Sequence, residues 1–138
     1  MKIVYNNIIP FKGFKAMAVW PFVFVRKSAR ITTTDINHEK IHCAQQCEVT
    51  VATLVLAFIL ALAGAFSFLW LIVSPLMYYA VYGLDWLVRL FASWLDAHKA
   101  YRNIVFEQEA YVNQTNAEYL KERKPFAFLK YIGIETYH

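Results

Sequence analysis

The stretch from Val49 to Leu84 constrains this chain most, because its 36 residues carry no charge at all. A helix of about 20 apolar residues crosses the hydrocarbon core of a bilayer. The uncharged stretch is therefore too long for one crossing and nearly long enough for two. We expect a membrane-embedded helical hairpin, with a deeply buried re-entrant pair as the alternative.

The two arms of this hairpin are predicted as Val49–Val73 and Pro75–Leu95, since a proline after Ser74 suits the first turn of a helix. Residues 64–67, Gly-Ala-Phe-Ser, offer an alternative place to turn. The second arm contains Asp85 and Arg89, whose spacing of four allows an ion pair on one helix face. Such a pair lowers the cost of placing both charges at the membrane surface or against protein.

Composition agrees with membrane association in a single domain. The chain has 138 residues, 59% of them hydrophobic and 17% charged, against roughly 25% charged in soluble domains. Lysines and arginines lie on both sides of the uncharged stretch and none lies within it. The positive-inside rule therefore predicts an inner-membrane protein with both termini on the cytoplasmic side. The net charge of +4 suits anionic lipid headgroups, and no basic cluster indicates nucleic-acid binding.

The pentapeptide at 38–42, His-Glu-Lys-Ile-His, precedes the apolar stretch. On a helix, His38 and His42 lie on one face and can bind a single metal ion. Glu39 follows one step round, where its carboxylate can take a proton from a metal-bound water. So short a motif also arises by chance, and the alternative is a surface helix whose histidines face water.

A helix is expected to begin directly before this motif. Residues 32–35, Thr-Thr-Thr-Asp, supply N-cap candidates, and no glycine or proline interrupts the chain from Lys27 to Ala63. The motif helix can therefore continue into the apolar stretch. Cys43 and Cys47 point away from the metal and are predicted to be small, reduced, packed thiols.

The N-terminal segment is rich in β-branched and aromatic residues over Ile3–Ile9 and Ala16–Val25, which predicts a β-hairpin or a small sheet. Pro21 would confine the second strand to an edge. An edge strand beside a metal helix can hold a peptide by strand addition, with Trp20, Phe22 and Val23 as candidates. The alternative is an ordinary apolar strand at the membrane interface.

Beyond the hairpin, residues 98–124 form a long amphipathic helical pattern, and residues 126–137 form an apolar closing segment. His98 and His138 are predicted to be isolated surface histidines. The helix carries two acidic candidates for a third ligand, Glu107 and Glu109, which lie about 200° apart and cannot face the same metal. The stripe around Glu107 is mostly polar and includes the small Ala110, which favours Glu107. Glu109 is interpreted as solvated, as ion-paired, or as accepting a hydrogen bond from a residue that binds the metal.

With HEKIH, the apolar run 49–95 and Glu107-Gln108-Glu109-Ala110 in this order, the chain resembles the gluzincins. Within them it resembles the membrane proteases related to the CAAX-prenyl protease and the heat-shock-induced membrane protease. It is also similar to small uncharacterised bacterial membrane proteins with HExxH. The resemblance implies zinc, peptidase activity and Glu107 as third ligand. Tyr111 stands where the family has an aspartate.

The sequence thus predicts a mainly α membrane protein with a transmembrane helical hairpin, a small N-terminal β-hairpin and a cytoplasmic zincin-like helix pair. Its expected parts are residues 1–34, 35–95 and 96–138 of one domain. The expected function is that of a zinc-dependent hydrolase that acts on a peptide or membrane-protein substrate, with Glu39 as general base. Tyr111, Tyr101 and Arg102 are candidate stabilisers of the transition state. The alternative is a membrane protein whose metal or polar cluster is structural.

Overall fold

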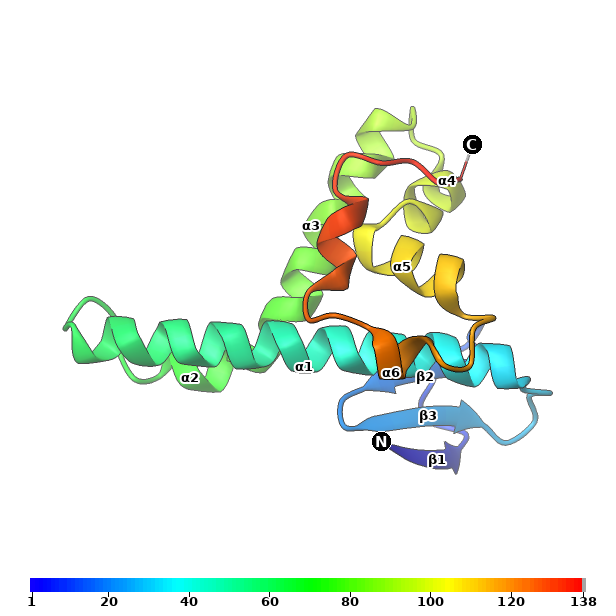
Figure 1. The fold of residues 1–138 in the computed structure, drawn as a ribbon, viewed down its shortest axis with the longest axis horizontal. Coiled ribbons are helices and arrows are strands. Elements are labelled where there is room, and N and C mark those ends of the chain that lie inside the picture. Colours follow the sequence, from blue (N-terminus) through cyan, green and yellow to red (C-terminus); the bar gives the residue numbers. More distant parts are fainter. Residues whose placement is uncertain (138) are drawn as a thin grey trace.

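The fold is that of a computed structural model, which describes residues 1–137, so His138 lies outside the described residues. A long helix, α1, forms the spine of the molecule (Figure 1). A small sheet packs on one side of its first half, and a lobe of short helices packs on the other. The second half of α1 projects away from both and is accompanied only by the returning chain.

The sheet has three strands, β1 (Lys2–Asn6), β2 (Ala16–Val19) and β3 (Phe22–Arg26), in the order β1-β3-β2. β3 pairs in parallel with β1 and antiparallel with β2. The predicted small sheet is present, but the expected strand Ala16–Val25 is two strands that turn at Trp20 and Pro21. Because Pro21 has no N–H to donate, it suits this turn better than a strand interior.

The edge position predicted for Trp20, Phe22 and Val23 is therefore wrong. Trp20 lies in the turn, while Phe22 and Val23 belong to the central strand, which has partners on both sides. The edge strand against α1 is β2.

Helix α1 (Thr33–Leu62) begins where the sequence predicts. Thr32 is the N-cap: its hydroxyl accepts from the Asp35 N–H, and the Asp35 carboxylate accepts from the Thr32 N–H. This reciprocal capping box satisfies two backbone donors that would otherwise lack partners. Cys43 is buried against the sheet and both cysteines are free, as expected.

The chain reverses at residues 63–69, the place that the sequence offered as the alternative turn, so the predicted first arm Val49–Val73 is too long. It returns through α2 (Trp70–Val73) and the 3-10 turn η1 (Ser74–Leu76) into α3 (Met77–Ala92). Two helical stretches, Thr33–Leu62 and Trp70–Ala92, are long and apolar enough to cross a membrane.

The C-terminal lobe consists of α4 (Ala97–Arg102), α5 (Val105–Asn113), α6 (Tyr119–Glu122) and the 3-10 turn η2 (Ala127–Tyr131). The single long helix predicted over residues 98–124 is thus broken into three. One break is stabilised from outside the segment, since the Asp85 carboxylate accepts from the Val105 N–H at the start of α5. The expected Asp85–Arg89 ion pair is present at 3.0 Å. The closing segment docks as predicted, with Phe128 buried against Phe106.

Candidate metal centre

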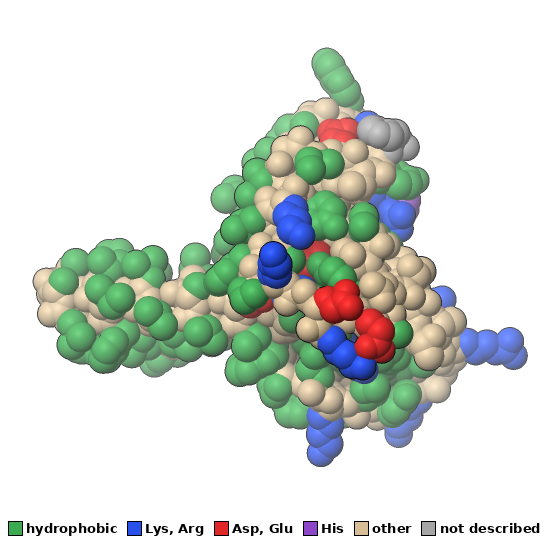
Figure 2. Space-filling model, viewed as in Figure 1, with side chains coloured by type: hydrophobic (Ala, Val, Ile, Leu, Met, Phe, Trp, Pro, Cys, Tyr) green, Lys and Arg blue, Asp and Glu red, His purple; other side chains and the backbone are tan. Residues whose placement is uncertain are grey.

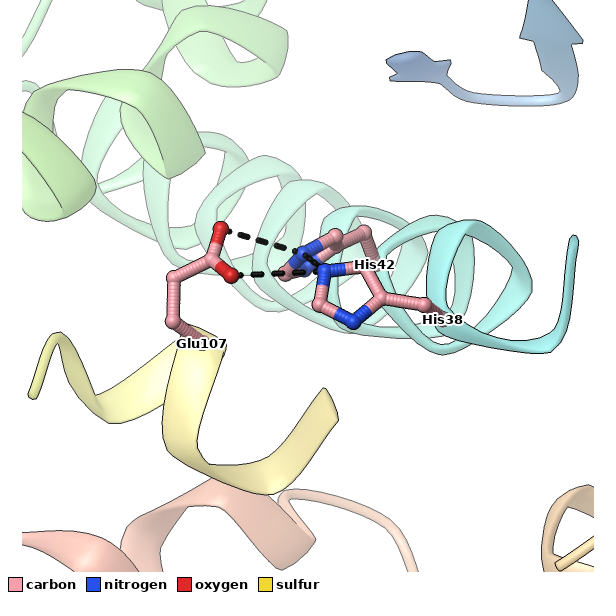
Figure 3. A group of neighbouring side chains, drawn as sticks. All are labelled: His38, His42 and Glu107. Carbon is pink, nitrogen blue, oxygen red and sulfur yellow. Dashed lines mark hydrogen bonds and ion pairs between the residues drawn. The ribbon is translucent and has the colours of Figure 1, made fainter. Parts of the chain in front are cut away.

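Three side chains from two helices converge beside the first half of α1 (Figure 3). His38 and His42 stand one turn apart on α1, and Glu107 reaches them from α5. The two Nε2 atoms lie 3.0 Å apart. The Glu107 oxygens lie 3.3 Å from His38 Nε2 and 3.2 Å from His42 Nε2. All three residues are buried, as a group that could hold a metal ion.

These separations fit a tetrahedral ion. Bonds of about 2.0–2.1 Å at tetrahedral angles hold neighbouring ligand atoms roughly 3.3–3.4 Å apart. The observed separations of 3.0 to 3.3 Å, which run from each histidine to a different Glu107 oxygen, are close to that spacing.

The orientation of His42 is fixed by Gln45, one turn further along α1. Gln45 Nε2 donates to the Phe106 carbonyl and to Glu109 Oε2, each at 3.0 Å. Both partners can only accept, so the amide oxygen of Gln45 must face His42 Nδ1, which lies 2.8 Å away. His42 Nδ1 therefore carries the proton, and its Nε2 presents a lone pair to the centre.

His38 is held in the same manner. Its Nδ1 lies 3.1 Å from Oε1 of Gln114, at the end of α5. In the tautomer in which His38 Nδ1 donates to Gln114, as His42 Nδ1 donates to Gln45, two Nε2 lone pairs and one carboxylate face the same point. Such an arrangement is repulsive unless a metal ion or a proton stands between the three groups.

The carboxylate of Glu107 has one satisfied oxygen and one open oxygen. Oε1 accepts from the Tyr82 hydroxyl at 2.7 Å. Oε2 is buried and receives no hydrogen bond among the described residues. Burial alone would raise the pKa of Glu107, but without a metal ion the added proton on His42 and His38 holds it well below its usual range, so this carboxyl stays ionised.

A cavity of about 370 Å³ opens beside the three ligand candidates. Glu39 lines it together with His38, His42 and Glu107. Its other walls are mostly apolar, from β2 (Ala16, Met17, Ala18) and from the aromatic residues of α3 (Tyr78, Tyr79, Tyr82, Trp86). The centre is therefore accessible from a space large enough for a small substituent of a substrate.

The candidate transition-state stabilisers are near the centre but differ in position. Tyr101 lines the cavity. The Tyr111 ring lies edge-on to His38, with centroids 4.7 Å apart, and Arg102 stacks on Tyr111 at 3.7 Å. Neither Tyr111 nor Arg102 is among the residues that line the cavity. Tyr101 is thus the best placed of the three.

Glu109 is fully buried and ion-paired, in agreement with one of its three predicted states. Its carboxylate accepts from Arg123, which also binds Glu48 on α1, and from the Tyr119 hydroxyl. The Gln45 amide joins this network to His42. Glu109 thus faces away from the two histidines, as the helical-face interpretation requires.

Sequence reasoning missed Gln45, Gln114 and Tyr82, the residues that position the three ligand candidates. Gln45 could have been found, because it lies three residues beyond His42 on the same helix face. Gln114 belongs to the polar stripe predicted on Glu107's side of the helix, but its contact with His38 carries no signal in the sequence. Tyr82 is far from the motif and carries no local signal.

Comparison of the chain with protein-family models, with curated proteins and with solved structures finds no match. The function must therefore be inferred from the centre itself.

Proposed function

We propose that this chain is a membrane-associated zinc-dependent hydrolase of the peptidase type, with His38, His42 and Glu107 as zinc ligands. The observation that carries the proposal is the convergence of two histidine Nε2 atoms and a buried carboxylate with one open oxygen. The resemblance of HEKIH and Glu107 to gluzincins supports the same assignment. Three ligands of this kind are typical of catalytic zinc.

Zinc bound there would polarise a carbonyl and lower the pKa of a coordinated water towards about 7. The Glu39 carboxylate would accept the proton of the attacking water and pass it to the leaving amine. Tyr101, from the cavity wall, would donate a hydrogen bond to the developing oxyanion. The apolar cavity walls would exclude bulk water and hold an apolar side chain of the substrate.

A catalytic centre is favoured over a structural zinc site by the number of ligands. Structural zinc has four protein ligands, whereas the described residues here supply three, next to a cavity. The second candidate function is a metal-free polar cluster that ties α1 to α5. The 3.0 Å contact between the two Nε2 atoms favours this reading, because a shared proton could bridge it.

Membrane association is part of the proposal. The helices Thr33–Leu62 and Trp70–Ala92 have the length and hydropathy for it. In the most apolar part of each helix, only 28% and 11% of the residues are buried. Basic residues lie on both sides of the uncharged stretch, so we place the centre and both termini on the cytoplasmic face of the inner membrane.

The experiment measures zinc per chain in protein purified in mild detergent, together with hydrolysis of an unstructured casein substrate. About one zinc per chain is expected. His38→Ala, His42→Ala and Glu107→Ala should each lose it, whereas Glu39→Gln should keep zinc and lose hydrolysis. His98→Ala is the matched control, because His98 is exposed and outside the cluster.

Full zinc with no hydrolysis by the native chain would favour a structural metal site. Absence of zinc after growth in zinc-supplemented medium, with a folded protein, would favour the metal-free polar cluster. Loss of zinc in Glu39→Gln as complete as in the histidine variants would contradict the general-base assignment.

A further inference from the structure

The projecting part of the molecule, residues 53–76, is here named the apolar arm. We propose that the apolar arm enters only one leaflet of the bilayer, and that α3 lies along the surface of the same leaflet. The inference rests on the membrane association in the proposed function and is independent of the zinc centre. It makes the protein monotopic, in contrast to the expected transmembrane hairpin.

The surface of the apolar arm is hydrocarbon-like on all sides. Most of its large apolar side chains are exposed, from Val73 at 38% to Leu69 at 68% and Ile72 at 74%. No charged residue occurs from Val49 to Leu84, and Figure 2 shows a green arm with every Lys, Arg, Asp and Glu side chain in view on the rest of the molecule. A surface of this size and composition is stable only when lipid or protein covers it.

The apolar arm is too short to cross a bilayer. Its two sides meet the body where the Thr53 hydroxyl lies 3.2 Å from the Ser74 carbonyl, and α1 ends at Leu62. The roughly ten residues from Thr53 to Leu62 rise about 15 Å at 1.5 Å per residue. The hydrocarbon core is about 30 Å thick, so the arm reaches about its middle.

The tip of the apolar arm is built for an apolar phase. A tip that emerged into water would be expected to be polar, but here Phe66, Phe68 and Leu69 are exposed. Gly64, with a φ of 71°, reverses the chain so that Ala65 N–H donates to the Leu60 carbonyl. The N–H groups of residues 63–66 and 69–72 all donate within the arm, which lowers the cost of placing this turn in hydrocarbon.

The hydroxyls of Thr53 and Ser74 also donate within the apolar arm. The Thr53 hydroxyl donates to backbone carbonyls of α1 and across to Ser74, and the Ser74 hydroxyl donates to the Trp70 carbonyl. These bonds leave little for water to solvate within the arm.

α3 leaves the apolar arm at a steep angle to α1 (Figure 1). One face of α3 carries Tyr78, Tyr82 and Trp86 into the core. The opposite face is an exposed apolar stripe at alternating spacings of three and four, consisting of Val81, Leu84, Val88 and Phe91. An amphipathic helix of this kind lies in the interface plane, and α1 entering along the membrane normal would place α3 in that plane.

The first experiment locates the tip. Ala65→Cys, in a background with Cys43→Ala and Cys47→Ala, is treated with an impermeant maleimide in spheroplasts and in inverted inner-membrane vesicles of a bacterial host. We expect no labelling from either side and full labelling after detergent is added. Ile8→Cys, 84% exposed on the body, is the matched control and should react from one side only.

Labelling of Ala65→Cys from the side opposite to Ile8→Cys would mean that the arm spans the bilayer and would overturn the proposal. Labelling from the same side as Ile8→Cys would mean that the arm is in water, and would overturn it as well. Recovery of the chain in the soluble fraction would remove membrane association itself, and the zinc measurement would remain unaffected.

The second experiment measures depth with a bimane on Ala65→Cys or Leu84→Cys in vesicles of lipids brominated at defined acyl positions. Quenching at residue 65 should be strongest with bromine near the bilayer centre. Quenching at residue 84 should be strongest with bromine near the headgroups. Strongest quenching at residue 84 with bromine near the bilayer centre would overturn the interfacial placement of α3. Strongest quenching at residue 65 with bromine near the headgroups would overturn the insertion of the apolar arm.

Discussion

The two halves of α1 differ in the kind of side chain that they bury. In the first half, His38, His42, Gln45 and Gln46 are buried and hydrogen-bonded, whereas in the second half only Thr50 and two alanines are buried. Leu56, Ile59 and Leu62 are exposed instead. A single helix thus has a polar interior contact at one end and an apolar exterior at the other. Burial in this chain follows the surroundings of each half, which are protein for the first and, as we propose, a hydrocarbon phase for the second.

The largest effect in the body is expected from Glu109→Ala. It leaves the Arg123 guanidinium, 4% exposed, with Glu48 as its remaining carboxylate partner. Breaking one side of a buried ion pair typically costs about 3–5 kcal/mol in the free energy of unfolding. Urea denaturation in mild detergent, followed by circular dichroism, measures the loss.

Glu118→Ala is the matched control, because Glu118 pairs with Lys121 on the surface and such pairs contribute little. Equal losses in Glu109→Ala and Glu118→Ala would show that the body is not held by its buried network.

A charge on the apolar arm is expected to weaken membrane binding and to leave the metal centre unchanged. Ile59→Asp places a carboxylate on a side chain that is 56% exposed, where lipid is proposed to lie. The cost of about 3 kcal/mol should lower binding to vesicles roughly 100-fold, as vesicle flotation can measure. Zinc content should not change, and Ile59→Leu should leave both quantities as they are. Unchanged flotation of Ile59→Asp would contradict the proposal that the second half of α1 lies in lipid.

The link between the buried network and the centre is tested by Gln45→Ala. The change removes the acceptor of His42 Nδ1–H, so zinc affinity should fall about 10- to 100-fold while the three ligands remain. Competition with a chromogenic chelator gives the affinity. Gln46→Ala is the matched control: Gln46 is also buried, but it binds the backbone of Ala18 and Trp20 instead of a histidine. A similar fall in both variants would argue for a general loss of packing.

The smallest expected effect is at the start of α1. Thr32→Ala removes the hydroxyl that accepts from the Asp35 N–H and should cost about 1 kcal/mol in unfolding free energy. Thr33→Ala is one residue beyond the N-cap, outside this contact, and should cost less. The midpoint of urea denaturation distinguishes them. Flotation should be unchanged in both variants, because the cap lies at the far end of α1 from the apolar arm.

Local features of this fold could be predicted from the sequence. The cap at Thr32, the shared face of His38 and His42, and the choice of Glu107 over Glu109 all follow from helical spacing within a few residues. The Asp85–Arg89 pair is confirmed for the same reason.

Features set by long-range contacts could not be predicted. The parallel pairing of β1 with β3 brings together residues about twenty apart, and no local pattern distinguishes it from a simple hairpin. The break of the C-terminal helix depends on Asp85, a residue of another helix. Gln114 reaches His38 across 76 positions, so its role appears only when α1 and α5 are packed.

The unbroken course of α1 from the centre into the apolar arm has a consequence for which bonds could be cleaved. His42 lies eleven residues before Thr53, which corresponds to about 16 Å along a rigid helix. With the arm inserted as proposed, α1 acts as a ruler that holds the reacting atoms at a set height above the lipid. A membrane-anchored substrate would then be selected by the length of its tether as much as by its residues. Cleavage of a series of substrates with tethers of graded length should show an optimum.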